Sequence, residues 1–572
     1  MKTSDYVARF LAAQGIPQVF EVVGGMITHL LDSMHVNNAP RVVSVHHEQA
    51  AAFAAEGYAR MTGIPGVALA TSGPGATNLL TGIGSCFFDS TPALFLTGQV
   101  NRSEQKRDKA IRQLGFQETD ITSIAAPITK ASILIDDADQ VPAIFERAVL
   151  TALSGRPGPV LLDIPMDVQR VDIQPQRIES VRPPAGVEPD EALVREALDA
   201  LRRAERPLIL VGGGIRSGRA AGALRILLED VQIPVVNSLM AVDVLPFAHP
   251  QRAGLIGSYG NRWANLAIAR SDVMLVLGSR LDVRQTGADT DGFRAGRRIF
   301  HVDCEPGEMN NRVTGCTAIE SELQPFLLAM ARRASAHGIV ASEEWTREIA
   351  SLRAQWPDTA ESPELKGINP NVFLHQLSRA AQSAAAYVAD VGQHQMWAAQ
   401  SLELGPEQRF LTSGGMGAMG FGLPAAIGAC FAVPGQPVVL IAGDGGFQLN
   451  IQELETVRRN GLPLKMILIN NGCHGMVRQF QQSYFHERYQ STLWGYSAPD
   501  FARVAGAYDI PAKTVERDSE IDGALSWMSA SDGPALLQVM IDTYTNAYPK
   551  LAFGRPITEM EPLATPLEME GT

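Results

Sequence analysis

The pattern best suited to chemistry is a glycine-rich run holding one aspartate, followed 27 positions later by an asparagine. Asp444 lies in the Gly-Asp-Gly-Gly run 443–446, directly after the apolar run 437–442, and Asn471 follows a second apolar run, 464–469. Apolar residues at helical spacing lie between the two runs, which predicts a strand, a helix and a second strand. Both polar residues would then lie at the carboxyl ends of strands, where open α/β sheets bind ligands.

The residue types in this unit favour a divalent cation held together with phosphate groups. The Asp444 carboxylate and the Asn471 amide carbonyl are hard oxygen donors that suit Mg²⁺, with diphosphate oxygens and water completing the shell. Gly445 and Gly446 let the backbone approach the phosphates. A Gly-Asp-Gly tripeptide alone is most often an ordinary turn. The strand, helix, strand and Asn-Asn context makes the binding site the better interpretation.

Glu48 is the candidate for acid–base chemistry. It follows the strand-like run 41–45 and opens an alanine-rich helix predicted over 49–61. A glutamate in the first helical turn usually only complements the helix dipole. Glu48 alone therefore indicates little, and its interpretation depends on the rest of the chain.

Length, composition and charge limit the class of protein. The chain has 572 residues, which is too long for folding around a single hydrophobic core. Its composition, 45% apolar and 19% charged, is that of an ordinary globular protein. The net charge of −13 argues against nucleic acid or an anionic membrane as the main partner. Five scattered cysteines without a CxxC pair favour reduced thiols over a disulfide framework. The chain begins without a signal-like segment, and prolines break its most apolar region, 421–443. We expect a cytoplasmic protein.

Strand-like and helical runs alternate along the chain, which predicts an α/β fold of three parallel-sheet domains flanked by helices. The expected domains cover residues 1–170, 190–336 and 365–545, separated by connectors rich in proline and charge. Residues 546–572, rich in proline and acidic groups, are expected to form a tail over the surface or an active site. No short internal repeat is visible, but the first and third domains are candidates for a common fold.

Four long stretches, in the same order, resemble the catalytic subunit of acetolactate (acetohydroxyacid) synthase, which depends on thiamine diphosphate (ThDP). They are residues 71–78, 116–120, 390–397 and 443–454. The resemblance implies pyrimidine-binding, central FAD-type and diphosphate-binding domains. Glu48 would hydrogen-bond the cofactor pyrimidine, whose imino form takes the proton from the thiazolium carbon. A scaffold of the same fold without catalysis would not need Glu48.

The resemblance also implies roles for further residues. The Cys473 backbone carbonyl would complete the Mg²⁺ shell, and Met419 would wedge between the two cofactor rings. Glu48 would serve a neighbour's cofactor, so a homodimer or homotetramer is expected. Whether a regulatory subunit exists stays open. Beside the reacting two-carbon unit would lie Gly25, Phe116 and Gln117. The other expected ThDP contacts are Gly73, Asn78, Gly392, Gln393, His394, Gly417, Gly443, Gly445, Gly446 and Met476.

The second domain carries a weak dinucleotide signal, with glycines after one strand-like run and an acidic residue after a later one. Acetolactate synthases hold FAD in this domain, so the resemblance implies FAD as a structural passenger, because carboligation has no redox step. At 315–317 the chain departs from the family's usual Gly-Asp, which leaves the adenine end open. The expected FAD contacts are Gly212, Gly213, Gly214, Gly278, Arg280, Asp282, Arg284 and Asp303.

Departures from the biosynthetic synthases cluster on the acceptor side. Phe480 stands where those enzymes place a tryptophan that favours 2-ketobutyrate, and Gly472 removes a side chain from a nearby loop. This pattern is similar to the YerE-like carboligases of branched-chain sugar biosynthesis, which transfer a two-carbon unit from pyruvate to a ketone. We therefore expect a ketone or nucleotide ketosugar as acceptor. The alternative is acetolactate synthesis from pyruvate or 2-ketobutyrate. Candidate substrate contacts are Arg284, Phe480 and Lys130.

Overall fold

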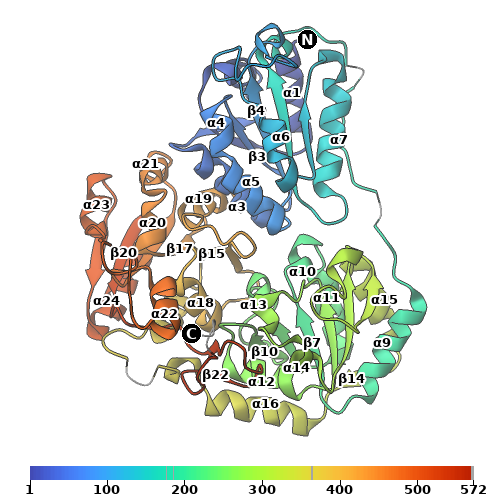
Figure 1. Ribbon diagram of the computed structural model, residues 1–572, viewed down its shortest axis with the longest axis vertical. Helices are drawn as coiled ribbons and strands as arrows, with labels where there is room; N and C mark the ends of the chain where they lie inside the picture. The colour runs from blue at the N-terminus through green and yellow to red at the C-terminus, as the bar shows by residue number, and fades with distance from the viewer. Residues whose placement is uncertain (176, 185, 363–364, 568–572) are drawn as a thin grey trace. The chain divides into compact units, whose positions relative to one another are not determined.

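The computed structural model describes residues 1–175, 177–184, 186–362 and 365–567, and three six-stranded sheets flanked by helices form most of it (Figure 1). This confirms the predicted α/β class with three parallel-sheet domains. By packing, the chain divides into two compact units: residues 1–185 with 413–438 and 449–464, and residues 186–412 with 439–448 and 465–572. The predicted third domain contributes to both units, and the exact domain boundaries stay predictions.

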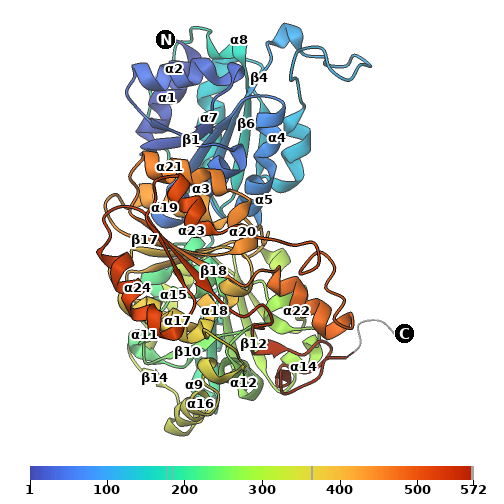
Figure 2. The same ribbon diagram turned by 90° about the vertical axis from the view of Figure 1, so that its left-hand side faces the viewer.

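The first sheet has the strand order β2-β1-β3-β4-β6-β5. Helices cover both faces, so its strands are apolar throughout rather than alternating. One face packs against α1, α2, α7 and α8, and the other against α3, α5 and α6 (Figure 2). The elements are β1 (Gln18–Val22), β2 (Arg41–Ser44), β3 (Gly66–Ala70), β4 (Ala93–Gln99), β5 (Ala131–Leu134), β6 (Pro159–Pro165), α1 (Thr3–Ala13), α2 (Thr28–Val36), α3 (Glu48–Thr62), α4 (Pro74–Asn78), α5 (Leu80–Phe88), α6 (Ile121–Ala125), α7 (Val141–Leu153) and α8 (Met166–Gln169).

The helix α3 begins at Glu48, as the sequence predicts. His47 caps its first turn by accepting a hydrogen bond from the Gln49 backbone, and Gly63 ends it in the left-handed conformation. In the same unit, α19 (Gly422–Ala432) packs closely along α3, because a Cβ at Gly57 or at Gly428 would overlap a backbone carbonyl of the other helix. This packing fixes the helix that presents Glu48.

The central sheet has the order β10-β9-β7-β11-β12-β13, which is 3-2-1-4-5-6 when its strands are numbered along the chain. That is the order of dinucleotide-binding folds. In Figure 1, α9, α11 and α15 lie on one face, and α12 and α16 pack on the other. The elements are β7 (Pro207–Val211), β9 (Val235–Asn237), β10 (Arg252–Leu255), β11 (Val273–Leu277), β12 (Arg298–Asp303), β13 (Thr317–Glu320), α9 (Glu191–Arg203), α10 (Gly214–Ser217), α11 (Ala221–Asp230), α12 (Arg262–Arg270), α13 (Val283–Thr286), α14 (Thr290–Arg294), α15 (Leu323–Ala334) and α16 (Glu343–Gln355), with β8 (Val231–Gln232) and β14 (Ile339–Val340) as a separate pair.

The third sheet, β16-β15-β17-β18-β20-β19, repeats the strand order of the first, which confirms the expected similarity of the two domains. One face packs against α17, α18 and α24. The elements are β15 (Ala386–Ala389), β16 (Arg409–Thr412), β17 (Val438–Gly443), β18 (Leu464–Asn470), β19 (Ala512–Val515), β20 (Ala535–Met540), α17 (Pro370–Ala380), α18 (Gln393–Ser401), α20 (Asp444–Gln448), α21 (Leu454–Arg459), α22 (Gly475–Tyr484), α23 (Phe501–Ala507) and α24 (Asp518–Ala530).

The helical segment after Asp444 differs from the expected continuous helix. The chain forms α20, breaks at Asn450, and resumes as a 3-10 turn, η8 (Ile451–Glu453), before α21. The Asn450 side-chain amide donates to the Gly420 carbonyl at 2.8 Å and to Gln49 Oε1 at 3.1 Å. These bonds compete with helical pairing, which explains the break.

The C-terminal tail is part of the second unit's core rather than a loose cover. β21 (Lys550–Leu551) and β22 (Met560–Glu561) form an antiparallel pair, and the apolar tail residues pack into the central domain. The buried Arg262 pairs with Glu361 at 2.8 Å and donates to the Met560 and Glu561 carbonyls. Among the described residues, no helix is long and apolar enough to cross a membrane.

Candidate active site

The predicted diphosphate half of the site lies at the carboxyl edge of the third sheet. Asp444 directly follows β17 and Asn471 directly follows β18, as the sequence predicts. β15 and β17 are neighbours in the sheet. Along the chain β16 comes between them, but it pairs with the opposite edge of β15. Such a switch in strand order opens a crevice where ligands bind. Asp390, directly after β15, lies at this edge too.

Asp444 and Asn471 have environments suited to a hard cation. Asp444 is only 2% exposed, and burial raises the pKa of its carboxyl to about 6. The Asn471 oxygen accepts from the Cys473 backbone at 3.2 Å, and its nitrogen donates to Gln393 Oε1 at 3.1 Å. Among the described residues, no three His, Cys, Asp or Glu side chains form a metal cluster. The donors that fit are thus one carboxylate, one amide oxygen and one backbone carbonyl, a set typical of Mg²⁺.

Cys473 fits the expected role of its carbonyl rather than its sulfur. The Cys473 thiol donates to the Thr543 carbonyl at 3.5 Å. Burial raises the pKa of this thiol to about 11, so it stays protonated at neutral pH. A protonated thiol is a poor metal ligand.

His394 and the glycines beside it form the part of the crevice suited to phosphate. Burial lowers the pKa of His394 to about 3, so the ring is neutral, and its Nε2 has no hydrogen-bond partner among the described residues. A Cβ at Gly392 would lie 2.6 Å from His394 Cε1, and one at Gly443 would lie 2.8 Å from Nδ1. Gly475, where a Cβ would overlap the Gln393 side chain, opens α22, whose first backbone N–H groups suit an anion. The residues present therefore fit a diphosphate.

The predicted pyrimidine half lies in the first unit. The Asn78 amide donates to Glu48 Oε2 at 2.9 Å, and a Cβ at Gly75 would lie 3.3 Å from Glu48 Oε1. Gly73 has φ +64°, and a Cβ there would lie 2.9 Å from the Gln117 Cβ. The structure thus brings Asn78 and Gly75 to Glu48, and Gly73 to Gln117. Phe116, beside Gln117, is 80% exposed.

The loop that carries Gly417 and Met419 is held by a residue that the sequence did not single out. Asp89, at the end of α5, accepts hydrogen bonds from the Gly414 and Gly415 backbones at 3.0 and 2.6 Å in the same unit. Gly417 is exposed and has φ +63°. Gly25 follows β1 at the switch of the first sheet, next to Met26, whose backbone donates to Thr71 Oγ1 at 3.3 Å.

Three family models match the chain. They are "Thiamine pyrophosphate enzyme, N-terminal TPP binding domain" over residues 1–124, the central domain over 194–330, and the C-terminal TPP binding domain over 390–539. The chain belongs to the thiamine pyrophosphate enzyme family. Thiamine pyrophosphate is another name for ThDP, so the two predicted half-sites lie in domains whose relatives bind this cofactor.

Curated relatives narrow the assignment to enzymes like acetolactate synthase. The chain is 38% identical to "Acetolactate synthase isozyme 2 large subunit" of Escherichia coli, over 98% of this chain and 99% of that protein. It is 37% identical to "Acetolactate synthase" of Arthrospira platensis, over 97% and 96%. It is 36% identical to Escherichia coli isozyme 1, over 97% of each. These findings favour the acetolactate synthase alternative and do not support the expected YerE-like, ketone-accepting carboligase.

The expected FAD contacts of this enzyme lie around two touching loops of the central domain. A Cβ at Gly214 would lie 2.7 Å from the Gly278 Cα, and one at Gly212 would overlap the Gly278 carbonyl. Gly213 is partly exposed, and Asp303 ends β12. Asp282 caps α13 by accepting from the Arg284 backbone at 2.8 Å, and it pairs with Arg280 at 3.2 Å.

The predicted substrate contacts of the enzyme have different environments. Phe480, on α22, is 37% exposed, and its ring lies 4.8 Å from that of Tyr484. Arg284 is exposed. Lys130, in the first unit, donates to the Ser154 and Arg156 carbonyls at 2.6 and 2.8 Å. Its ammonium thus binds the end of α7, and its role as a substrate contact stays a prediction. Met476 is partly buried and packs against the core of the third sheet.

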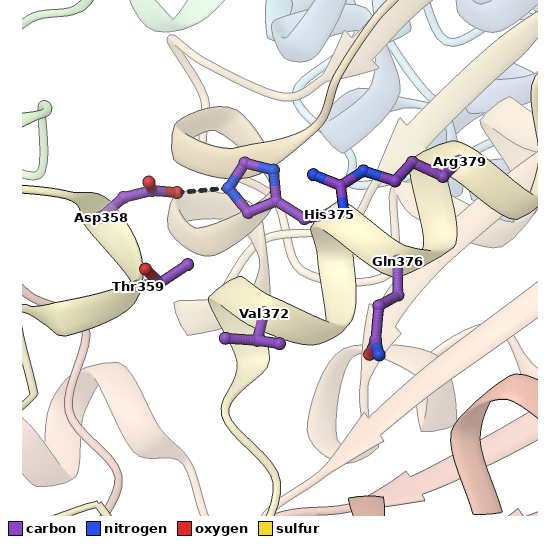
Figure 3. A pocket seen from close by; sticks show the side chains of 6 residues that line it. All are labelled: Asp358, Thr359, Val372, His375, Gln376 and Arg379. Atoms are coloured by element: carbon purple, nitrogen blue, oxygen red, sulfur yellow. Dashed lines mark hydrogen bonds and ion pairs between the residues drawn. The ribbon is translucent and has the colours of Figure 1, made fainter.

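A recess of about 340 Å³ in the second unit is lined by none of the residues named for ThDP (Figure 3). His375 bridges two carboxylates there, with Nε2 2.9 Å from Asp358 and Nδ1 2.8 Å from Glu403. Arg379 also pairs with Glu403, at 2.6 Å. Burial opposes the charged imidazole, but the two carboxylates outweigh it and raise the pKa of His375. The bridge joins α17 to the connector before it.

Replacing His375 by glutamine is expected to lower the unfolding temperature more at pH 5.5 than at pH 8.5. Because the pKa of His375 is raised on folding, its stabilisation is complete below its unfolded pKa of about 6.5 and is lost as the pH rises through the folded value. Asp358 and Glu403 have lowered pKa values, so their stabilisation is lost only as the pH falls below about 4. Thermal unfolding at the two pH values tests this, with the exposed His337→Gln as control. An equal loss at both pH values would contradict the bridge.

Proposed function

We propose that this enzyme decarboxylates pyruvate and joins the remaining two-carbon unit to the keto carbon of a second 2-keto acid, giving acetolactate when that acid is pyruvate. The observation that carries the proposal is the edge of the third sheet, where Asp444 and Asn471 follow neighbouring strands and His394 Nε2 has no hydrogen-bond partner among the described residues. The chain aligns over 98% of its length with an acetolactate synthase large subunit. A scaffold without catalysis would have no use for this arrangement together with Glu48.

The second unit would hold the diphosphate and its cation. Mg²⁺ would be bound by the Asp444 carboxylate, the Asn471 amide oxygen and the Cys473 carbonyl. Gly445 and Gly446 would let the backbone approach the phosphates. A Cβ at Gly446 would lie 3.0 Å from the Asp390 carboxyl, so a larger residue there would press on Asp390. The remaining diphosphate contacts would come from Gly392, Gln393, His394, Gly443 and the first turn of α22.

The pyrimidine would be held by Glu48 of the first domain and, from a neighbouring copy of the chain, by Gly417 and Met419 of the third domain. When bound, ThDP supplies a carbanion that adds to the keto carbon of pyruvate and lets carbon dioxide leave. Glu48 would donate its carboxyl proton to the pyrimidine ring nitrogen, while Asn78 holds the other carboxyl oxygen. Gly417 would offer its carbonyl to the pyrimidine amine, and Met419 would separate the rings. Gly25, Phe116 and Gln117 would exclude water from the reacting carbon.

We also propose that two or four copies of the chain form the enzyme. The resemblance to the family places the two half-sites of one cofactor on neighbouring subunits, and the exposed Phe116 would be covered there. The two similar proteins from Escherichia coli are named large subunits, and whether this chain has a smaller partner stays open. The free cysteines Cys86, Cys304, Cys316, Cys430 and Cys473 fit a reducing compartment such as the cytoplasm.

FAD is expected to co-purify with the enzyme and to remain oxidised during turnover. The central sheet has the dinucleotide-binding strand order, and Gly212–Gly214 and Gly278 follow its β7 and β11, neighbours in the sheet. Carboligation moves no electrons to a flavin. Absorption spectra of gently purified protein, before and after adding pyruvate, measure both points. Colourless and fully active protein would contradict the FAD proposal but would not affect the proposal for the ThDP site.

Acceptor choice is tested by product analysis. The enzyme is incubated with pyruvate alone, with added 2-ketobutyrate, and with simple and cyclic ketones, and the products are identified by mass. The proposal predicts acetolactate from pyruvate and acetohydroxybutyrate with 2-ketobutyrate, with the exposed Arg284 binding the acceptor carboxylate. Phe480→Trp should shift acceptor preference toward 2-ketobutyrate by about 10-fold, since a pocket contact of this size is worth about 1–3 kcal/mol. Tertiary alcohols from ketones, without acetolactate, would overturn the proposal.

A further inference from the structure

Asp444 has a hydrogen-bond partner from a distant part of the second unit. The Tyr496 hydroxyl donates to Asp444 Oδ2 at 2.8 Å across 52 positions of the chain. The Tyr496 ring lies 4.5 Å from the His474 ring, centroid to centroid. Tyr496 therefore touches the candidate cation ligand on one side and the loop after Asn471 on the other.

The segment that delivers Tyr496 is itself tied to that loop. Thr492 accepts a hydrogen bond from the His474 backbone at 3.0 Å and donates to Gln481 on α22 at 2.5 Å. The turn that follows includes Gly495, whose φ of +76° favours glycine. The Tyr496 backbone closes it by donating to the Leu493 carbonyl at 3.3 Å. The hydroxyl is thus held at Asp444 by a folded segment rather than by a freely rotating loop.

We propose that Tyr496 is a positioning residue for the cation site: its hydroxyl fixes the rotation of the Asp444 carboxylate, so that the other carboxylate oxygen faces the cation. The inference rests on the proposed Mg²⁺ and ThDP site. Asp444 begins a short helix directly after a buried strand, and the backbone N–H groups of Asp444 and Gly445 also bond to its carboxyl. Tyr496 is the side chain that bonds to this carboxyl from another segment. Partners that orient a metal ligand in this way typically change metal affinity by 10–100-fold when they are removed.

A competing interpretation predicts the opposite change in cation affinity. If the Tyr496 hydroxyl occupied the oxygen that the cation needs, removal of the hydroxyl would tighten cation binding. The two interpretations are therefore separated by the direction of the change in affinity. His474 supports the positioning role, because its ring holds the Tyr496 ring in place independently of any cation.

The test measures Mn²⁺ binding, in place of Mg²⁺, by the electron paramagnetic resonance of free Mn²⁺ in the presence of ThDP. Wild type is compared with Tyr496→Phe, which keeps the ring and removes the hydroxyl. Tyr508→Phe is the matched control, because Tyr508 lies in the same unit, just past the end of α23, and is half-buried. Thermal unfolding of the cofactor-free variants checks that both are folded.

We expect Tyr496→Phe to raise the Kd for Mn²⁺ about tenfold and the KM for ThDP in step. At saturating cation and ThDP, kcat should change less than threefold, which a general loss of structure would not allow. Tyr508→Phe should match wild type. An unchanged or lower Kd in Tyr496→Phe would overturn the proposal. A wild-type enzyme that binds no Mn²⁺ with ThDP would instead refute the proposed function, and the positioning role with it.

Discussion

Replacing Glu48 by glutamine is expected to lower the turnover of pyruvate by about 10²–10⁴-fold, the range of a lost acid–base group. The amide retains the size of the side chain and can still bond to Asn78 Nδ2 through its oxygen. It cannot share a proton with the pyrimidine in the same way, so the cofactor would bind without being activated. Carbon dioxide release under saturating ThDP and Mg²⁺ measures the effect.

The control for Glu48→Gln is Glu191→Gln. Glu191 is also the first residue of a helix, α9, where a glutamate complements the helix dipole. Glu191→Gln should retain wild-type turnover, and both variants should unfold near the wild-type temperature. If Glu48→Gln released carbon dioxide at the wild-type rate, Glu48 would only complement the helix dipole, and its proposed acid–base role would be wrong.

Replacing Asp444 by asparagine is expected to weaken the binding of Mg²⁺ and ThDP at least 100-fold, because the site loses its single carboxylate. The same change should leave the cofactor-free protein as stable as wild type or more stable at pH 7. Burial raises the pKa of Asp444, so its charge destabilises the fold when no cation is present. Calorimetric titration and thermal unfolding measure the two effects, which have opposite signs.

A matched control for Asp444→Asn is Asp518→Asn. Asp518 is the first residue of α24 in the same unit, and it lies outside the candidate site. Its replacement should leave ThDP binding unchanged. If Asp444→Asn bound ThDP and Mg²⁺ as tightly as wild type, the edge of the third sheet would not be the diphosphate site.

Local patterns in the sequence predicted the strands and helices that present the candidate site. The apolar runs before Asp444 and Asn471 became β17 and β18, and the run after Glu48 became α3, because strands buried on both faces and capped helices leave clear local signals. The position of each polar residue at a strand end follows from those elements alone. Gly392 was found only through the resemblance, since a single glycine after a strand is common.

Contacts made across long stretches of chain were not visible in the sequence. Tyr496 reaches Asp444 from a turn with no periodicity, and Asp89 reaches Gly414 and Gly415 from a different domain of the sequence. The break at Asn450 likewise depends on a partner thirty residues away. The tail, rich in proline and acidic groups, was expected to lie over the surface or an active site, but the short β21–β22 pair buries Met560 in the central core. Two-residue strands are too short to show alternation.

The acceptor substrate could not be predicted from single residues. Phe480 and Gly472 are local departures, and they pointed to a ketone acceptor when they were weighed alone. Similarity over nearly the whole chain favours acetolactate synthesis instead. A single ring in a partly exposed position changes discrimination by only about 1–3 kcal/mol, so it is weaker support than sequence identity over nearly the whole chain.

The most direct test of the central claim is the cofactor dependence of the reaction. Protein stripped of ThDP and metal is incubated with pyruvate, and the products are followed by nuclear magnetic resonance as ThDP and Mg²⁺ are added singly and together. We predict acetolactate and carbon dioxide only when both are present, with saturation at one ThDP per chain. Pyruvate that remains unchanged at saturating ThDP and Mg²⁺, or turnover that needs neither, would contradict the account.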